Sequence, residues 1–232
     1  MQSVVRSGKK TLLIFVGLLL MVMTMFSGTS FAASQGAVKV ITNNKSYTGI
    51  TADIKLSSNV DVNTGYVNWY LGIGAAKVEA GISRTPIGYK VFLNTGWKES
   101  GEQDEYWISS YDSSIEDGDT VNLKLVNNGD DTITMYVNGE VYVNEDGVRY
   151  EERPIYDGLA QYEQVKMVMG VEDDGSNSFS EASFSNVQLR ANASGSIYKK
   201  WDSSISSEFS RYSSYGDDFN VSSQVPLSAS LR

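Results

Sequence analysis

The sequence predicts an all-β domain, built as a sandwich of two antiparallel sheets. The chain of 232 residues contains 21 glycines and 3 prolines, is rich in Ser, Thr, Asn and aromatic residues, and shows hardly any helical periodicity. Several short segments instead alternate apolar and polar residues with the period of two that half-buried strands have. Turn signals separate these segments at a spacing typical of β-sandwiches.

The first segment has the layout of a secretory signal peptide. Three cations within the first ten residues precede an apolar run, residues 12–26, and a stretch of small residues that ends at Ala33. The run is shorter than the roughly 20 residues that a membrane span needs. We therefore expect residues 1–32 to be a signal peptide, cleaved after Ala32 or Ala33, and the mature protein to be exported without a membrane anchor.

Two predicted strands show the alternation most clearly, GITADIKL at residues 49–56 and TVNLKLV at residues 120–126. In both, apolar and polar residues alternate, so one face of each strand would enter the core. The residues expected in the core are Ile50, Ala52, Ile54, Leu56, Val121, Leu123 and Leu125.

Two local signals mark a hairpin and a bulge. Asn138-Gly139 separates TITMYV from EVYV, and this dipeptide is the strongest short signal for a β-hairpin because both residues accept positive φ angles. In ASFSNVQL, residues 182–189, the alternation slips by one residue, which predicts a β-bulge near Ser185-Asn186.

We expect one sandwich domain over residues 33–190 and a Ser-rich C-terminal segment over residues 191–232. The segment holds 13 serines in 42 residues, but it also carries several large aromatic side chains, which serine-rich linkers rarely contain. We expect it to pack partly on the sandwich, and a disordered linker is the alternative.

Composition excludes several classes of function. The formal net charge of −9 argues against nucleic acid and anionic membranes as partners, since both require clustered Lys and Arg. The chain has no His and no Cys, which excludes Ser-His-Asp and Cys-His nucleophiles, disulfides and zinc sites of the usual type. The acidic runs NNGDD and EDDGSN lack the spacing of an EF-hand, so we expect solvated turns, no metal and no cofactor.

Strand parity singles out two acids. Glu79 in KVEAGI and Glu172 in VKMVMGVEDD both point away from the apolar row of their own strand. If the two faces belong to one concave sheet, the acids would lie close enough to share a proton, and we take both as candidate catalytic residues. Paired carboxylates also serve glycoside hydrolysis. The alternative is that each acid is only the polar phase of a surface strand.

Aromatic residues form the other candidate site. Tyr66, Asn68 and Tyr70 share one face of a predicted strand, and Trp107 and Tyr111 share one face of another. Rings presented by a sheet can stack on sugar faces, so these five are the predicted ligand-binding residues. The competing interpretation assigns such rows to the core. The E-x-D-x-x-E signature of jelly-roll glucanases is absent, since GEQDEYW has Trp107 where the third acid would stand.

Taken in order, several motifs resemble the concanavalin-like jelly-roll sandwiches, and in particular the glutamic peptidase branch. They are NWYLGIGAAKVEAGI, IEDGDTVNLKL, TITMYVNGE and VKMVMGVEDD. The resemblance implies a jelly-roll fold, with Glu79 at the place of the family's catalytic glutamine and Glu172 at that of its catalytic glutamate. Glutamate thus replaces glutamine, and the tryptophan expected before the second acid is missing. The chain is also similar to uncharacterised exported proteins of Gram-positive bacteria.

The sequence supports three hypotheses about function. The leading one is a secreted, non-catalytic protein, extracellular or associated with the cell wall, that binds an extracellular polysaccharide or protein on its concave sheet. The alternative is a carboxylate-dependent acid hydrolase, of glutamic peptidase or glycosidase type, that uses Glu79 and Glu172. The third is a structural or matrix protein. The sequence leaves the oligomeric state open.

Overall fold

The computed structural model describes residues 34–74, 78–96, 107–155, 159–173, 175–191, 197–212 and 218–232. The predicted signal peptide and the acids of GEQDEYW lie outside these residues. No α-helix occurs in the described ranges, and thus no helix there has the length and apolarity needed to cross a membrane.

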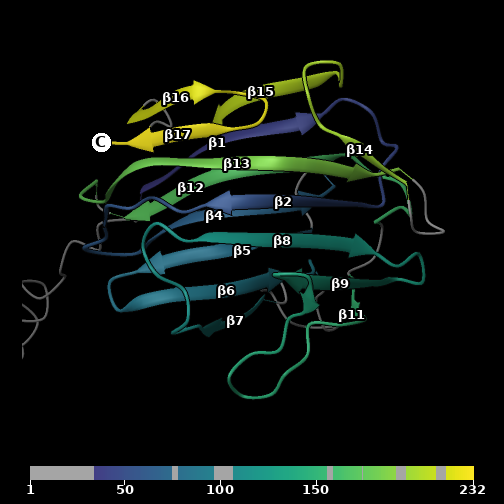
Figure 1. Ribbon diagram of the computed structural model, residues 1–232, viewed down its shortest axis with the longest axis horizontal. Helices are drawn as coiled ribbons and strands as arrows, with labels where there is room; N and C mark the ends of the chain where they lie inside the picture. Colours follow the sequence, from purple (N-terminus) through teal and green to yellow (C-terminus); the bar gives the residue numbers. More distant parts are fainter. Residues whose placement is uncertain are drawn as a thin grey trace, which may run out of the picture. The chain divides into compact units, whose positions relative to one another are not determined.

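Seven antiparallel strands form the first sheet, in the order β15-β1-β12-β4-β5-β6-β7 (Figure 1). Their bounds are β1 (Ser34–Thr42), β4 (Tyr66–Ile73), β5 (Val78–Thr85), β6 (Gly88–Asn94), β7 (Trp107–Tyr111), β12 (Val165–Asp173) and β15 (Ser207–Tyr212).

Ten strands form the second sheet. Its main order is β10-β9-β8-β2-β13-β17-β16, with β11 paired to β9 and both β3 and β14 paired to β13. Their bounds are β2 (Gly49–Lys55), β3 (Val60–Asp61), β8 (Thr120–Asn127), β9 (Thr132–Val137), β10 (Glu140–Val141), β11 (Arg153–Pro154), β13 (Ser178–Arg190), β14 (Tyr198–Lys200), β16 (Phe219–Ser223) and β17 (Ser228–Leu231).

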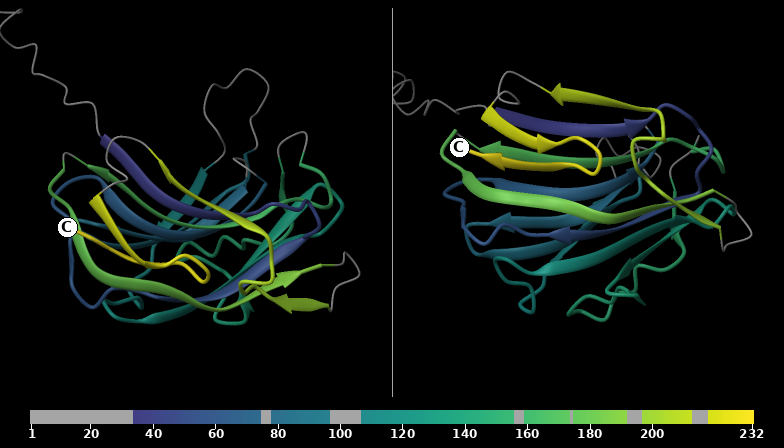
Figure 2. Two further views of the ribbon diagram at one scale, coloured as in Figure 1. Left: turned by 90° about the horizontal axis from the view of Figure 1, so that it is seen from above. Right: turned by 45° about the horizontal axis from the view of Figure 1, so that its top comes forward.

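The core lies between the two sheets, which Figure 2 shows as stacked layers. The seven core residues predicted from GITADIKL and TVNLKLV are all buried. Trp69 of β4 meets Phe179 of β13 edge to face, with ring centroids 5.3 Å apart, so large side chains from both layers interlock. Each fully buried aliphatic side chain contributes roughly 2 kcal/mol to folding. The prediction of an all-β sandwich of two antiparallel sheets is confirmed.

Both local signals are also confirmed. Asn138 and Gly139 adopt φ angles of 52° and 89° between β9 and β10. On β13, the pairing with β2 shifts register between Ser185 and Gln188, and Asn186 has a φ of 50°, which is the predicted bulge.

The C-terminal segment contributes strands to both layers. β15 pairs with β1 in the seven-stranded sheet, whereas β17 pairs with β13 in the ten-stranded sheet. Trp201 is fully buried, and its indole N–H donates to the hydroxyl of Ser207 at 3.0 Å. The aromatic residues of this segment thus act as anchors for its polar stretches.

Candidate active site on the open face of the seven-stranded sheet

One face of the seven-stranded sheet is turned away from the core, and we call it the open face. On β4, Val67, Trp69, Leu71 and Ile73 are fully buried in the core, so Tyr66, Asn68, Tyr70 and Gly72 belong to the open face. The pairing of β4 with β5 and β12 puts Glu79 directly opposite Gly72, and Glu172 opposite Tyr66. Both candidate acids therefore share one sheet face, with the tyrosines of β4 between them.

Glu79 forms an ion pair with Lys166 of β12 across the intervening strand β4. Their backbones lie two strand spacings, or roughly 10 Å, apart, a distance that the two side chains span together. Gly72 makes the crossing possible, because a Cβ there would lie 2.4 Å from Cε of Lys166. Only 3% of the Lys166 side chain and 20% of the Glu79 side chain are exposed to solvent.

Tyr70 completes this group. Its pKa is raised well above the usual value of 10, first by burial and then by the negative charge of Glu79. The phenol therefore stays protonated, and it also hydrogen bonds Glu79. The Lys166 ammonium lies 5.9 Å from the centre of the Tyr70 ring. One carboxylate is thus held by one cation and one neutral donor.

Glu172 has a different set of partners. The Tyr66 hydroxyl donates to its carboxylate at 3.0 Å, and the side-chain amide of Gln35 on β1 also donates to it. Burial raises the pKa of Tyr66, the charge and hydrogen bond of Glu172 raise it further, and the more remote charge of Glu79 adds to the effect.

The structure does not pair the two acids with each other. Tyr66 and Gly72, which mark their positions on β4, are six residues apart, or roughly 20 Å along a strand. Glu79 contacts Lys166 and Tyr70, whereas Glu172 contacts Tyr66 and Gln35. The two carboxylates thus have different hydrogen-bond partners, although the charges of both raise the pKa of Tyr66. A proton shared between them stays a prediction.

An aromatic pocket of about 280 Å³ lies toward the β7 edge of the open face. Trp107, with 47% of its surface exposed, stacks on Phe92 of β6 with ring centroids 4.7 Å apart and an interplanar angle of 12°. Lys90 lies over the ring of Tyr111 at 4.7 Å. Tyr66 forms part of the opposite wall.

A second pocket of about 120 Å³ lies on the other side of Tyr66, toward β15. Asn68, Tyr70 and Tyr212 contribute to its lining. Tyr66 lines both pockets, so the two pockets are neighbours. Together their lining residues come from all seven strands of the sheet. All five predicted ligand-binding residues therefore lie on the open face, and four of them line these pockets; Tyr111 stands beside them.

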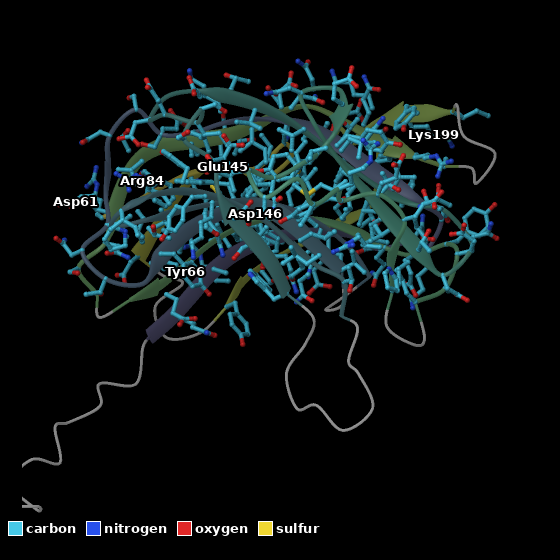
Figure 3. All side chains as sticks on the ribbon, turned by 90° about the horizontal axis from the view of Figure 1, so that it is seen from below. Asp61, Tyr66, Arg84, Glu145, Asp146 and Lys199 are labelled. Carbon is cyan, nitrogen blue, oxygen red and sulfur yellow. The ribbon has the colours of Figure 1, made fainter. Side chains whose placement is uncertain are left out.

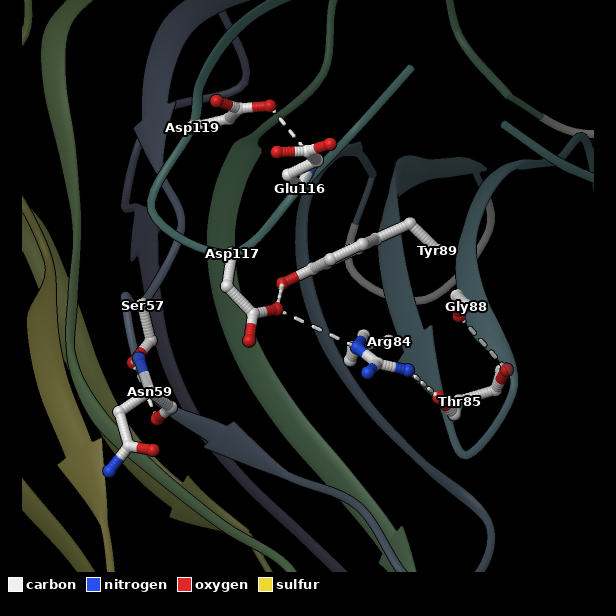
Figure 4. A network of polar contacts seen from close by, with 9 residues as sticks. All are labelled: Ser57, Asn59, Arg84, Thr85, Gly88, Tyr89, Glu116, Asp117 and Asp119. Carbon is white, nitrogen blue, oxygen red and sulfur yellow. Dashed lines mark hydrogen bonds and ion pairs between the residues drawn. The ribbon is translucent and has the colours of Figure 1, made fainter. Parts of the chain in front are cut away.

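A further polar cluster surrounds Arg84, which lies opposite Val67 at the end of the strands where Tyr66 also lies (Figure 3). The Asp117 carboxylate accepts a hydrogen bond from the Tyr89 hydroxyl at 2.7 Å and lies 3.6 Å from Arg84 (Figure 4). Asp119 accepts from the backbone N–H of Glu116 at 2.9 Å. The two Asp117 contacts fasten the loop before β8 to β6 and β5, and the Asp119 contact closes the loop on itself, so we assign the cluster a structural role. No group of three or more acidic side chains suited to a metal ion occurs in the described part of the chain.

Sequence reasoning missed Lys166, Gln35 and Phe92. Lys166 has the same parity as Glu172 in VKMVMGVEDD, so its face was predictable, but its partner was not. The signal was Gly72, since a glycine between two polar positions leaves room for a side chain to cross.

Comparison with protein-family models and with curated protein sequences found no match. Among solved structures, the fold is that of glutamic peptidases. Scytalido-glutamic peptidase with a peptide-based transition state analogue matches with a TM-score of 0.55 at 12% identity, over 85% of this chain and 98% of that one. The same peptidase with a transition state analogue inhibitor gives 0.56 at 12% identity, over 86% and 98%.

A third structure is SCP-B, a member of the eqolisin family of peptidases, in complex with the tripeptide Ala-Ile-His. It matches with a TM-score of 0.57 at 10% identity, over 86% of this chain and 98% of that one. The resemblance to glutamic peptidases is thus supported at the level of the fold. The similarity to exported Gram-positive proteins stays a prediction.

Proposed function

We propose that the chain is a carboxylate-dependent hydrolase that cleaves an extended polymer, most simply a peptide, bound across the open face. The observation that carries the proposal is the convergence of Glu79, Lys166 and Tyr70 at one point of that face. The pockets beside it cross seven strands, or roughly 29 Å, enough for about eight residues of an extended chain. The likeness in fold to peptidases that were solved with peptide-like ligands supports the same class of reaction.

In this mechanism Glu79 is the reacting carboxylate. It accepts a proton from water as the water oxygen bonds to the carbonyl carbon of the scissile amide. The positive charge of Lys166 stabilises the negative charge that develops on the carbonyl oxygen. Glu79 then returns the proton to the departing nitrogen as the C–N bond breaks. Because the hydrogen bond from Tyr70 and the ion pair with Lys166 orient the carboxylate, it needs little reorganisation during the reaction.

A peptide library incubated with the purified chain between pH 3 and 7, with products read by mass spectrometry, tests this proposal. We expect cleavage by the native chain and a loss of at least about 100-fold in Glu79→Gln, which keeps the shape but removes the base. Glu208→Gln is the matched control, because Glu208 is an exposed acid of β15 opposite Ile41. Cleavage by Glu79→Gln at the native rate, or no cleavage of any peptide, would overturn the proposal.

A second candidate function is non-catalytic binding of an extracellular polysaccharide or protein. Two observations favour it: Lys166 neutralises the charge of Glu79, and Trp107 presents an exposed ring stacked on Phe92. Retention by insoluble glycans or cell walls that disappears in Trp107→Ala, together with no hydrolysis, would select this function over the first.

Both candidate functions include the proposal that the protein is exported from the cell. It rests on the signal-like layout of residues 1–32 and on the absence of cysteines, which leaves the fold independent of the redox state of its compartment. N-terminal sequencing of protein recovered from the culture medium tests it. A mature chain that starts at Ala33 or Ser34 is expected. Protein that still begins at Met1 and is found only inside the cell would contradict export.

A further inference from the structure

We propose that the small pocket between β15, β1, β12 and β4 binds a protonated amine, either the α-ammonium of a peptide or the side-chain ammonium of a lysine. This inference deepens the proposed function and rests on it for the identity of the ligand, because it names which end or side chain of a polymer the open face selects. We call this space the amine pocket; its lining includes Gln35, Tyr66, Asn68, Tyr70, Gly170 and Tyr212.

The first argument is a buried acceptor without a partner. Asn68 is only 7% exposed, and its Oδ1 atom has no hydrogen-bond partner among the described residues. A Cβ added at Gly170 would lie 2.5 Å from this oxygen, so Oδ1 lies over Gly170, which itself lines the pocket. A buried carbonyl oxygen without a donor costs roughly 1–3 kcal/mol. A ligand that brings an N–H group to this point would recover part of that cost.

The second argument is charge. Glu172 borders the amine pocket through its hydrogen bonds from Tyr66 and Gln35, both of which line it. Those two donors point at Glu172, and the lone pairs of the Tyr66 oxygen remain available to accept. Lys166 is engaged with Glu79 at the far end of β4. Lys39, two residues along β1 from Ala37, does not line the pocket.

The third argument is size and wall chemistry. The volume of about 120 Å³ corresponds to about four water-sized groups, enough for an ammonium and a few carbons. Three tyrosines, Tyr66, Tyr70 and Tyr212, contribute to the lining, and aromatic rings attract cations over their faces. A carboxylate ligand would instead lie beside the unpaired Asn68 carbonyl oxygen, with the negative charge of Glu172 just behind Tyr66 and Gln35, so the pocket disfavours anions.

Binding measured by calorimetry tests the inference in the Glu79→Gln background, which prevents turnover. The probes are trialanine amide with a free amine, its N-acetylated form, and N-acetyl-lysine amide. We expect at least one of the two amine-bearing probes to bind about tenfold or more tighter than the N-acetylated trialanine. The stronger of the two identifies the source, an N-terminus or a lysine side chain.

Two variants locate the selectivity. Glu172→Gln and Asn68→Leu should each abolish the preference for the amine, whereas Glu208→Gln, an equal loss of charge elsewhere on the open face, should retain it. If Asn68→Leu does not fold, the test rests on Glu172→Gln alone, since Glu172 is partly exposed and its substitution should not disturb the fold. Equal binding of the acetylated and free peptides, or loss of the preference in Glu208→Gln as well, would overturn the inference. If the native chain binds amines selectively but hydrolyses no peptide, the inference about the amine pocket stands and only the proposed hydrolase function is overturned.

Discussion

Lys166 and Glu79 form an ion pair over Gly72, and this contact joins β12 and β5 across β4. A lysine with 3% of its side chain exposed is far from bulk water, and the Glu79 carboxylate compensates its charge. The same pair holds the proposed reacting carboxylate in place. Stability and function are therefore coupled at this point of the open face.

Removal of the cation should destabilise the fold. Lys166→Met leaves Glu79 without its counter-charge, and we expect a loss of about 3 kcal/mol, at the lower end for a broken buried pair because Glu79 is 20% exposed. Urea unfolding followed by Trp fluorescence measures the change. Adding Glu79→Met should recover most of the loss, since an apolar pair of similar volume is often neutral.

The control for this prediction is Lys39→Met on the same sheet face. Lys39 is partly exposed and takes no part in the Glu79 ion pair, so its substitution should change stability by no more than about 0.5 kcal/mol. Equal effects of Lys39→Met and Lys166→Met would show that the ion pair contributes nothing specific.

Two glycines of the open face should respond differently to alanine. A Cβ at Gly81 would lie 2.4 Å from the carbonyl oxygen of Trp69, which belongs to the backbone and cannot move freely. At Gly170 the nearest atom is the tip of the Asn68 side chain, at 2.5 Å. We expect Gly81→Ala to cost about 3 kcal/mol and Gly170→Ala about 1 kcal/mol.

Thermal or urea unfolding of both glycine variants measures these values. Gly170→Ala should also displace the Asn68 amide, and amine binding at the pocket should weaken even though the fold remains intact. A larger stability loss at Gly170 than at Gly81 would contradict the steric argument.

Alkaline pH should destabilise the protein through its tyrosines. Burial, followed by neighbouring negative charge, raises the pKa of Tyr66 and Tyr70 above 10 in the folded state. The unfolded chain releases these protons near pH 10 while the folded chain keeps them. The contribution of Tyr66 and Tyr70 to the free energy of unfolding is therefore fully present below pH 10. It is lost as the pH rises from 10 toward the pKa values of the two tyrosines in the folded protein.

Urea midpoints between pH 8 and 11, with phenolate absorbance in parallel, check this behaviour. Tyr66→Phe should reduce the loss of stability above pH 10, because one titrating group is removed from the unfolded chain. A flat stability profile up to pH 11, or phenolate formation at Tyr66 near pH 10 in the folded protein, would contradict it.

Much of the fold was predictable because its cause is local. The period-two rows, the Asn138-Gly139 turn and the slip near Asn186 each follow from a few consecutive residues, and all three appear in the structure. The parity of Glu79 and Glu172 was predictable for the same reason. Parity states which face a side chain takes, but it carries no information about the neighbouring strand or the register with it.

The sequence by itself determined the sandwich class, the core rows, and the exclusion of nucleophiles that need His or Cys, because alternation and composition are properties of the chain alone. Only the tertiary structure decided the partners. The order β1-β12-β4-β5 and its register bring Lys166 to Glu79, and Tyr66 with Gln35 to Glu172, across separations of 87, 106 and 137 residues in sequence. Such contacts depend on strand order and register, which residues far apart in the chain fix together when they pack into one core.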